Sequence, residues 1–322
     1  MAFSGTSKSA LVITGLGFGM ALGLAAGTLV IAPNLDGASS TAVSGDEALR
    51  EEHRDLLQKN KDLSAQSNAA DSLVSNLSAD AISGVLDGRD VAIIATADAT
   101  ERDVDGIRSM LDAAGASDSG TISMANEFLH PDSADKLKSI VANVLPAGAE
   151  LDEQDLSAGR HTGQALAAAL LRNPDTTEPL ATTEDRGALL KSLREAGLIN
   201  YEDGTILPAQ AVVVVMGRGG DKYYHDNLVS FTHALKEAGR YTVVAGRLNA
   251  AGEGGVLDTL RKESASESDG AQEAVSTVDS INRKFAQLAT ALAVVEQIDG
   301  DFGAYGAGED VDATAPPMPQ GE

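Results

Sequence analysis

The sequence has neither cysteine nor tryptophan among its 322 residues. The absence of cysteine excludes disulfides, thiolate metal sites and cysteine nucleophiles. Aromatic residues make up only 3% of the chain, so a core must be built from Ala, Val, Leu and Ile. Carbohydrate-binding clefts and base-stacking surfaces, which rely on aromatic faces, are therefore not expected.

Basic residues are also scarce. The chain has 24 Lys and Arg against 48 Asp and Glu, a formal net charge of −24. Such a surface repels nucleic acid and anionic lipid, and it attracts cations or basic protein segments. We therefore expect no nucleic-acid partner, and the simplest reading of the acidity is solubility outside a membrane.

Local motifs for catalysis or metal binding are missing as well. The chain has five histidines, none three or four residues from another: His53, His130, His161, His225 and His233. No helix can therefore present a pair of imidazoles, and the methionines inside apolar runs fit core packing better than copper ligation. No nucleophilic Ser–His motif is present either. The sequence predicts no enzyme and no resident cofactor, although it leaves open a metal site assembled from distant segments.

One long apolar run is present near the start of the chain. Residues 10–32 carry no charge and are long enough to cross a bilayer as a helix. Gly15, Gly19, Gly23 and Gly27 recur every four residues, the small-residue stripe along which two membrane helices pack. A cleaved signal is the alternative, but its apolar region is usually shorter. Lys8 before the span favours a cytoplasmic N-terminus at residues 1–9, a single plasma-membrane pass, and an extracytoplasmic remainder.

A heptad pattern follows a flexible linker at residues 33–45. Between residues 46 and 80, leucine or alanine recurs every seven residues, at Leu49, Leu56, Leu63, Ala70 and Leu77. With these at d positions, Asn60 falls at an a position, a combination that favours two parallel strands. The other a positions are mostly polar, so a helix packed on its own domain is the alternative. We predict a parallel coiled-coil homodimer.

The rest of the chain alternates apolar runs with helical periodicity. Strands are predicted at 90–96, 121–124, 211–216, 242–245 and 274–278, and helices at 101–114, 133–144, 159–172, 184–196, 227–238, 255–262 and 282–298. Continuous apolar strands between helices predict an α/β domain at 88–302 with a mostly parallel sheet flanked by helices. The acidic, glycine- and proline-rich residues 303–322 are expected to be a disordered tail.

A glycine-rich turn follows the strand at 211–216. The string MGRGGDKYYH, which contains Gly217, Gly219 and Gly220, fits neither common phosphate-binding fingerprint. A turn leaving a buried strand explains these glycines without a ligand, although Arg218 could meet an anion there. The acidic residues between Glu296 and Asp312 likewise miss the calcium-loop spacing.

Several landmarks together resemble one family. These are the single N-terminal span, the coiled coil, residues 126–148 (NEFLHPDSADKLKSIVANVLPAG) and residues 274–306 (AVSTVDSINRKFAQLATALAVVEQIDGDFGAYG). They resemble the MctB-type envelope proteins of mycobacteria and corynebacteria over nearly the whole chain. The resemblance implies copper transport or tolerance, with a channel role in the outer membrane and copper as the associated metal. SteB-like relatives imply instead a division protein that controls cell-wall hydrolases.

The predicted span is a poor pore wall, because it offers only glycine and aliphatic side chains. We therefore expect a single-pass, dimeric envelope scaffold, with a cell-wall hydrolase or another division protein as partner and a role in cell separation. The alternative is copper transport or homeostasis of the MctB type.

Overall fold

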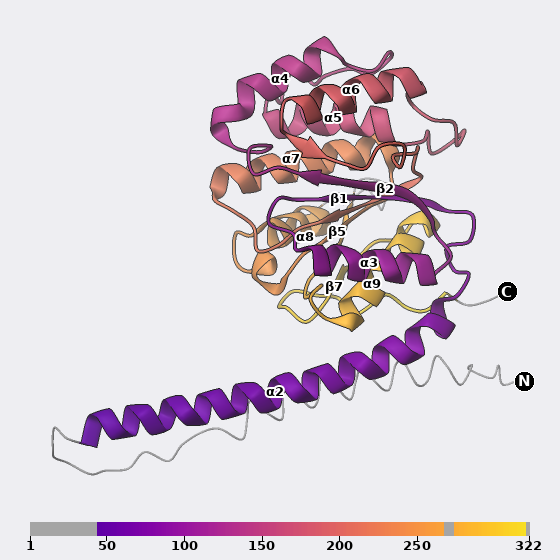
Figure 1. Cartoon of the computed structure of the whole chain (residues 1–322). Coiled ribbons are helices and arrows are strands. Elements are labelled where there is room, and N and C mark those ends of the chain that lie inside the picture. Colours follow the sequence, from indigo (N-terminus) through magenta and orange to yellow (C-terminus); the bar gives the residue numbers. More distant parts are fainter. Residues whose placement is uncertain (1–43, 267–273, 320–322) are drawn as a thin grey trace, which may run out of the picture. The chain divides into compact units, whose positions relative to one another are not determined.

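The structure is a computed structural model that describes residues 44–266 and 274–319 (Figure 1). The predicted span 10–32, with Gly15, Gly19, Gly23 and Gly27, lies outside the described residues, as does most of the predicted linker. Within the described ranges, no helix is both long and apolar enough to cross a membrane. The chain divides into two compact units, and the boundary along the sequence falls between Leu77 and Ser78.

Helix α2 (Ser44–Ile82) is a single helix of 39 residues. It contains the whole of the heptad region, so that region is helical throughout 46–80 as predicted. Exposed pairs one turn apart support it locally, such as Lys59 Nζ at 2.6 Å from the carboxylate of Asp55. The structure contains one chain, so the predicted coiled-coil pairing stays a prediction.

The second unit contains a seven-stranded sheet in the order β3-β2-β1-β4-β5-β6-β7. Its strands are β1 (Asp90–Ala95), β2 (Ser117–Met124), β3 (Ile199–Asn200), β4 (Ala211–Val215), β5 (Thr242–Ala245), β6 (Ser276–Val278) and β7 (Ala304–Tyr305). All neighbours pair in parallel except β2 and β3. Every residue of β4 and β5 is buried, as continuous apolar strands covered on both faces require. The predicted α/β fold is confirmed.

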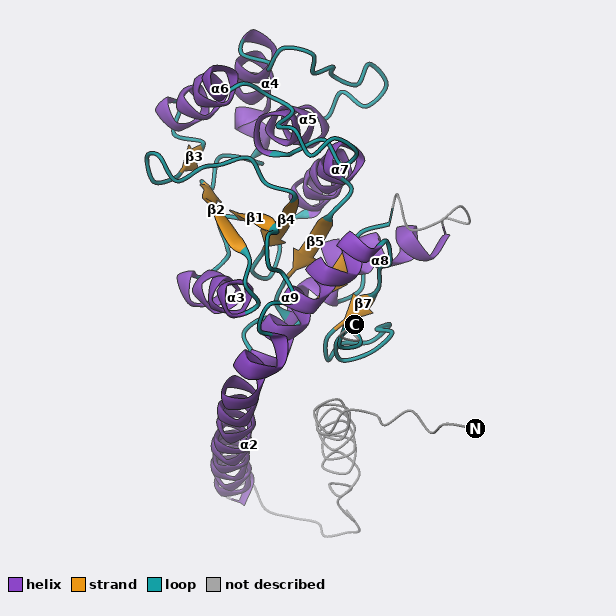
Figure 2. Cartoon of the chain, turned by 90° about the vertical axis from the view of Figure 1, so that its right-hand side faces the viewer, coloured by secondary structure: helices purple, strands orange, loops and turns teal. Residues whose placement is uncertain are grey.

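Helices cover both faces of this sheet. They are α3 (Glu101–Ala113), α4 (Ala134–Asn143), α5 (Ala158–Leu170), α6 (Thr183–Glu195), α7 (Lys222–Gly239), α8 (Val256–Ser266) and α9 (Lys284–Asp299), with short 3-10 turns at Pro131–Ser133 and Leu248–Ala251. Figure 2 shows α3 and α9 on one side of the strands and α5 and α7 on the other. Helix α9 is buried on nearly all sides, since it also packs on α3 and on β4 to β6.

Two glycines set the close packing of α5 on α7. A Cβ added at Gly159 would lie 1.9 Å from the backbone oxygen of Asn227, and one at Gly163 would lie 2.6 Å from that of Phe231. The Asn227 side chain also accepts a hydrogen bond from the Gly159 N–H at 2.8 Å. The two helices therefore approach backbone to backbone. Phe231 of α7 also packs edge-on against Phe128, which lies in the loop after β2.

The C-terminal segment departs from the prediction. Residues 303–322 were expected to be disordered, whereas β7 joins the sheet beside β6 and Tyr305 is buried. The fully buried carboxylate of Asp279 holds this segment, because it accepts hydrogen bonds from the N–H groups of Ala307 (2.8 Å) and Gly308 (3.2 Å). Tertiary hydrogen bonds thus order a stretch whose composition alone predicted disorder.

A buried arginine neutralises that carboxylate. Arg261 Nη2 lies 2.9 Å from Asp279 Oδ2, and both side chains are at most 5% exposed. Arg261 also donates to the Tyr305 and Glu309 carbonyl oxygens and to Thr277 Oγ1. All three nitrogens of its guanidinium therefore donate hydrogen bonds that join α8, β6 and the C-terminal segment, and the α/β unit extends beyond residue 302.

Candidate functional site

The first candidate is a row of exposed leucines on one side of α2. It consists of Leu56, Leu57, Leu63, Leu73 and Leu77, which are 44–59% exposed, and we call it the leucine face. Soluble surfaces rarely display so many leucines on one element unless the element has a partner. The feature therefore identifies a candidate interaction surface.

The leucine face coincides with the predicted heptad. Leu56, Leu63 and Leu77 are d positions, while Leu57 and Leu73 fall at the flanking e and g positions, which widens the apolar stripe. Asn60, the predicted a-position residue, is exposed on the same helix. Leu49 lies in the first turns of α2. The sequence analysis did not include Leu57 and Leu73, because it considered only the a and d positions of the heptad.

The second candidate is the glycine-rich turn. It follows β4, which pairs with β1 in the middle of the sheet. Chain order reverses between these strands, and α/β proteins bind ligands at the carboxyl ends of such strands. Here the Asp98 carboxylate lies in that position. Its Oδ2 accepts the Gly219 N–H at 2.9 Å, and its Oδ1 accepts Thr96 Oγ1 at 2.6 Å.

The neighbouring side chains complete this arrangement. Tyr224 donates to Asp98 Oδ1 at 3.3 Å, and burial followed by the charge of Asp98 raises the pKa of its phenol. A Cβ at Gly217 would lie 2.1 Å from the Asp98 carbonyl oxygen, so glycine is needed for the two loops to touch. The chain's own carboxylate thus accepts the Gly219 N–H that an anion would need, and the interpretation of a turn without a ligand stays a prediction. The side chain of Arg218, which the sequence suggested could meet an anion, is exposed.

His225 links this turn to the next loop. Its Nε2 lies 3.1 Å from the Gly220 nitrogen, and its Nδ1 lies 3.1 Å from the Gly254 carbonyl oxygen. Because a backbone N–H must donate to Nε2, the proton of the neutral ring is on Nδ1, where it donates to Gly254. A groove of about 630 Å³ between α7 and α8 begins here and also includes Asp226 and Glu263. Within the groove Lys222 Nζ lies 2.8 Å from the Asp226 carboxylate, and Glu263 pairs with His233 at 2.8 Å.

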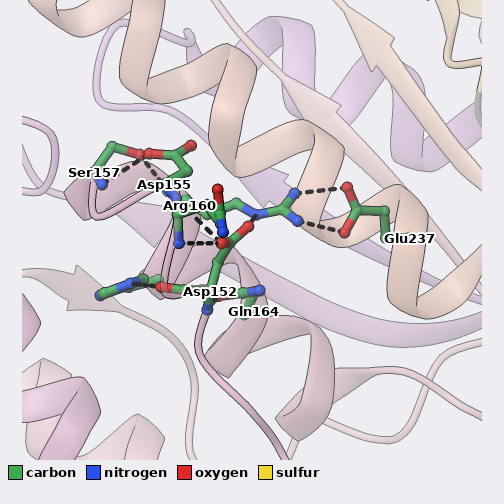
Figure 3. A network of polar contacts seen from close by, with 8 residues as sticks. Asp152, Asp155, Ser157, Arg160, Gln164 and Glu237 are labelled. Atoms are coloured by element: carbon green, nitrogen blue, oxygen red, sulfur yellow. Dashed lines mark hydrogen bonds and ion pairs between the residues drawn. The ribbon is translucent and has the colours of Figure 1, made fainter.

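A network of polar contacts joins the loop before α5 to α5 and α7 (Figure 3). Arg160 forks onto Glu237 with contacts of 2.7 and 2.6 Å, and its Nε donates to Asp152 at 3.1 Å. The N–H groups of Gln154 and Asp155, followed by Arg160, lower the pKa of the Asp152 carboxyl. Each charge in the network has a partner, which indicates a structural clamp rather than a reactive centre.

The imidazoles and carboxylates of the described part of the chain do not gather into a metal site. No group of three or more His, Asp or Glu side chains within residues 44–266 and 274–319 could hold a metal ion. The acidic residues near the C-terminus have structural contacts instead: Glu296 accepts the Tyr305 hydroxyl at 2.6 Å, and Asp312 accepts the Ala304 N–H at 2.8 Å.

Comparison with known proteins gives a consistent result. The family model described as "Copper transport outer membrane protein, MctB" matches residues 7–316. Proteins named copper transporter MctB from Mycobacterium tuberculosis and Mycobacterium bovis are 32% identical over 274 residues, which is 81% of this chain and 86% of theirs. The protein of the same name from Mycobacterium leprae is 29% identical over 245 residues, 73% of this chain and 75% of its own.

Proposed function

The chain belongs to the MctB family, and from this premise we propose that it is a membrane-anchored envelope protein that works as a parallel homodimer. The apolar stretch 10–32 would be the anchor, and α2 would pair through its leucine face. In this proposal the protein is a non-enzymatic scaffold that presents two copies of the α/β unit. The single observation that carries the pairing is the exposure of Leu56, Leu63 and Leu77 at heptad spacing on a continuous helix.

The chain itself offers a sharp test of pairing, since it has no cysteine. In a parallel, in-register pair the two copies of a d residue face each other, close enough for a disulfide. We expect Leu63→Cys in the full chain to give a covalent dimer on oxidation. The matched control is Ala65→Cys, at an outward f position two residues away, which should stay monomeric on a non-reducing gel.

A second pair of variants tests the apolar contact. Leu56→Asp with Leu63→Asp places charges on the seam and should convert the purified full chain to a monomer in light scattering. Gln58→Asp with Ala65→Asp has the same spacing and charge on the opposite side and should leave the dimer intact. Equal cross-linking of both cysteine variants, or an unchanged mass for the seam double variant, would refute parallel pairing through α2.

The second candidate function is copper transport or homeostasis, and the name of the family and of its relatives favours it. A copper role would use a site shared between chains, a site in residues not described, or a copper-binding partner. Titration of the full-length protein with Cu(I) and Cu(II) tests whether the protein itself is a ligand. Saturable binding at a fixed stoichiometry supports this candidate, and its absence removes direct ligation.

The role in cell separation stays a prediction. Its test is recovery of a cell-wall hydrolase or division protein with the tagged full chain from envelope extracts. Recovery that persists in the control double variant but is lost in the Leu56→Asp, Leu63→Asp variant would tie the partner to the dimeric form.

A further inference from the structure

One buried arginine lacks the partner that burial normally requires. Arg186 occupies the first turns of α6 and is 6% exposed. Its Nη1 is shielded from solvent and has no hydrogen-bond acceptor, while its Nη2 donates to Thr183 Oγ1 at 3.3 Å. The guanidinium therefore lies against the N-terminal turn of α6 with one of its two forked nitrogens unused.

An unpaired buried charge is costly, so its persistence needs an explanation. Scarcity of carboxylates is not the reason, because the chain has twice as many acidic as basic residues. By contrast, the other deeply buried arginine, Arg261, has the fully buried Asp279 as its partner. Asp185, in the first turn of α6, is not the counter-ion of Arg186 either, because its carboxylate accepts the Thr182 hydroxyl at 2.9 Å.

A second arginine and the start of a helix lie close to Arg186. Burial and then the charge of Arg172 lower the pKa of its guanidinium, so a second cation lies nearby. Arg172 is held by Asp90 at 3.0 Å and by the Thr177 carbonyl oxygen at 3.2 Å. The N-terminal turn of α6 adds the partial positive charge of a helix start, and it also carries the acidic Glu184 and Asp185.

The position in the fold separates this cluster from the glycine-rich turn. Asp90 is the first residue of β1, and Arg172 follows Leu171, which bridges Ala209 just before β4. The cluster therefore lies at the amino ends of the central strands, whereas Asp98 and Gly219 lie at their carboxyl ends. Any ligand here is independent of the crevice that Asp98 fills.

We propose that Arg186, Arg172 and the N-terminal turn of α6 form a binding site for a small oxyanion. A phosphate or carboxylate group offers two oxygens to a guanidinium fork, and it supplies the negative charge that the buried Arg186 lacks.

The test is calorimetric titration of the full chain with sodium phosphate and, separately, with sodium acetate, at an ionic strength held constant with sodium chloride. The wild-type chain is expected to bind at least one of the two anions saturably, and which one binds distinguishes phosphate from carboxylate recognition. Arg186→Met, similar in length but apolar, should bind that anion roughly tenfold more weakly or not at all, because a charge-assisted hydrogen bond is lost.

Lys191→Met is the matched control on the same helix. Lys191 is exposed and pairs only loosely with Glu195, at 3.8 Å, so this variant should bind like the wild type. Arg172→Gln provides a second measurement should Arg186→Met fail to fold, and it should also weaken binding. The absence of saturable binding to the wild type, or equal affinity in the wild type and both arginine variants, would overturn the proposal.

Discussion

Replacement of Asp279 by Asn tests what orders the C-terminal segment. The substitution keeps the shape of the side chain but removes its charge, which leaves the buried Arg261 without a counter-ion. It also turns an NH₂ group toward backbone donors, since the carboxylate accepts from the N–H groups of Ala307 and Gly308. Removing one partner of a buried pair costs about 3–5 kcal/mol.

That loss is large compared with the free energy of unfolding of a typical domain, about 5–15 kcal/mol. For a unit of this size each kcal/mol lowers the midpoint by about 2–4 °C, so Asp279→Asn should unfold roughly 6–20 °C below the wild type. Thermal and urea unfolding of the full chain, followed by circular dichroism, give both quantities. Limited proteolysis should also show earlier cleavage after residue 303.

Glu309→Gln is the control, because it removes one negative charge from an exposed side chain of the same segment. It should change the free energy of unfolding by less than about 0.5 kcal/mol. If Asp279→Asn were no more destabilising than Glu309→Gln, the buried pair would not be what fastens the C-terminal segment to the sheet.

Further predictions concern single side chains of the α/β unit. Burial raises the pKa of Glu296 above its ordinary value of 4.5, so the folded state binds this proton more tightly than the unfolded chain does. The free energy of unfolding should therefore fall as pH rises from the ordinary glutamate pKa through the raised pKa of Glu296. Glu296→Gln should flatten this pH dependence in urea midpoints measured from pH 4 to 8. An unchanged pH dependence would contradict the assignment to Glu296. Gly217→Ala should cost about 1–3 kcal/mol in urea unfolding, because its Cβ would collide with the Asp98 backbone. Gly187→Ala, with open space around the new methyl in α6, should instead stabilise by about 0.5–1 kcal/mol, and a loss there would refute the contrast.

Sequence periodicity located the regular elements well where burial was continuous. The run at 242–245 coincides with β5, and 211–216 exceeds β4 by a single residue. Helix α7 begins at Lys222, five residues before the predicted start, because Asp221 caps it by accepting the Tyr224 N–H at 2.9 Å. That cap could have been recognised in the sequence, since aspartate is a common N-cap residue.

The contacts that define the sites could not be predicted in this way. Asp98 meets Gly219 across 121 positions of sequence, and Asp279 orders residues that by composition resemble a solvated tail. Strands β3 and β7 have two residues each, too few to show a period. Arg186 carries no local signal either, because only the fold decides which of the arginines loses its solvent.

The Asp98 contact has a consequence for any anion that approaches the glycine-rich turn. A tethered carboxylate competes as an intramolecular ligand, with an effective concentration far above that of most free metabolites. Free phosphate would have to displace it from the Gly219 N–H and also sever its bonds to Thr96 and Tyr224. Asp98 thus occupies the Gly219 N–H, as His225 occupies that of Gly220, and a substitution at position 98 would make the Gly219 amide group available to a ligand from solution.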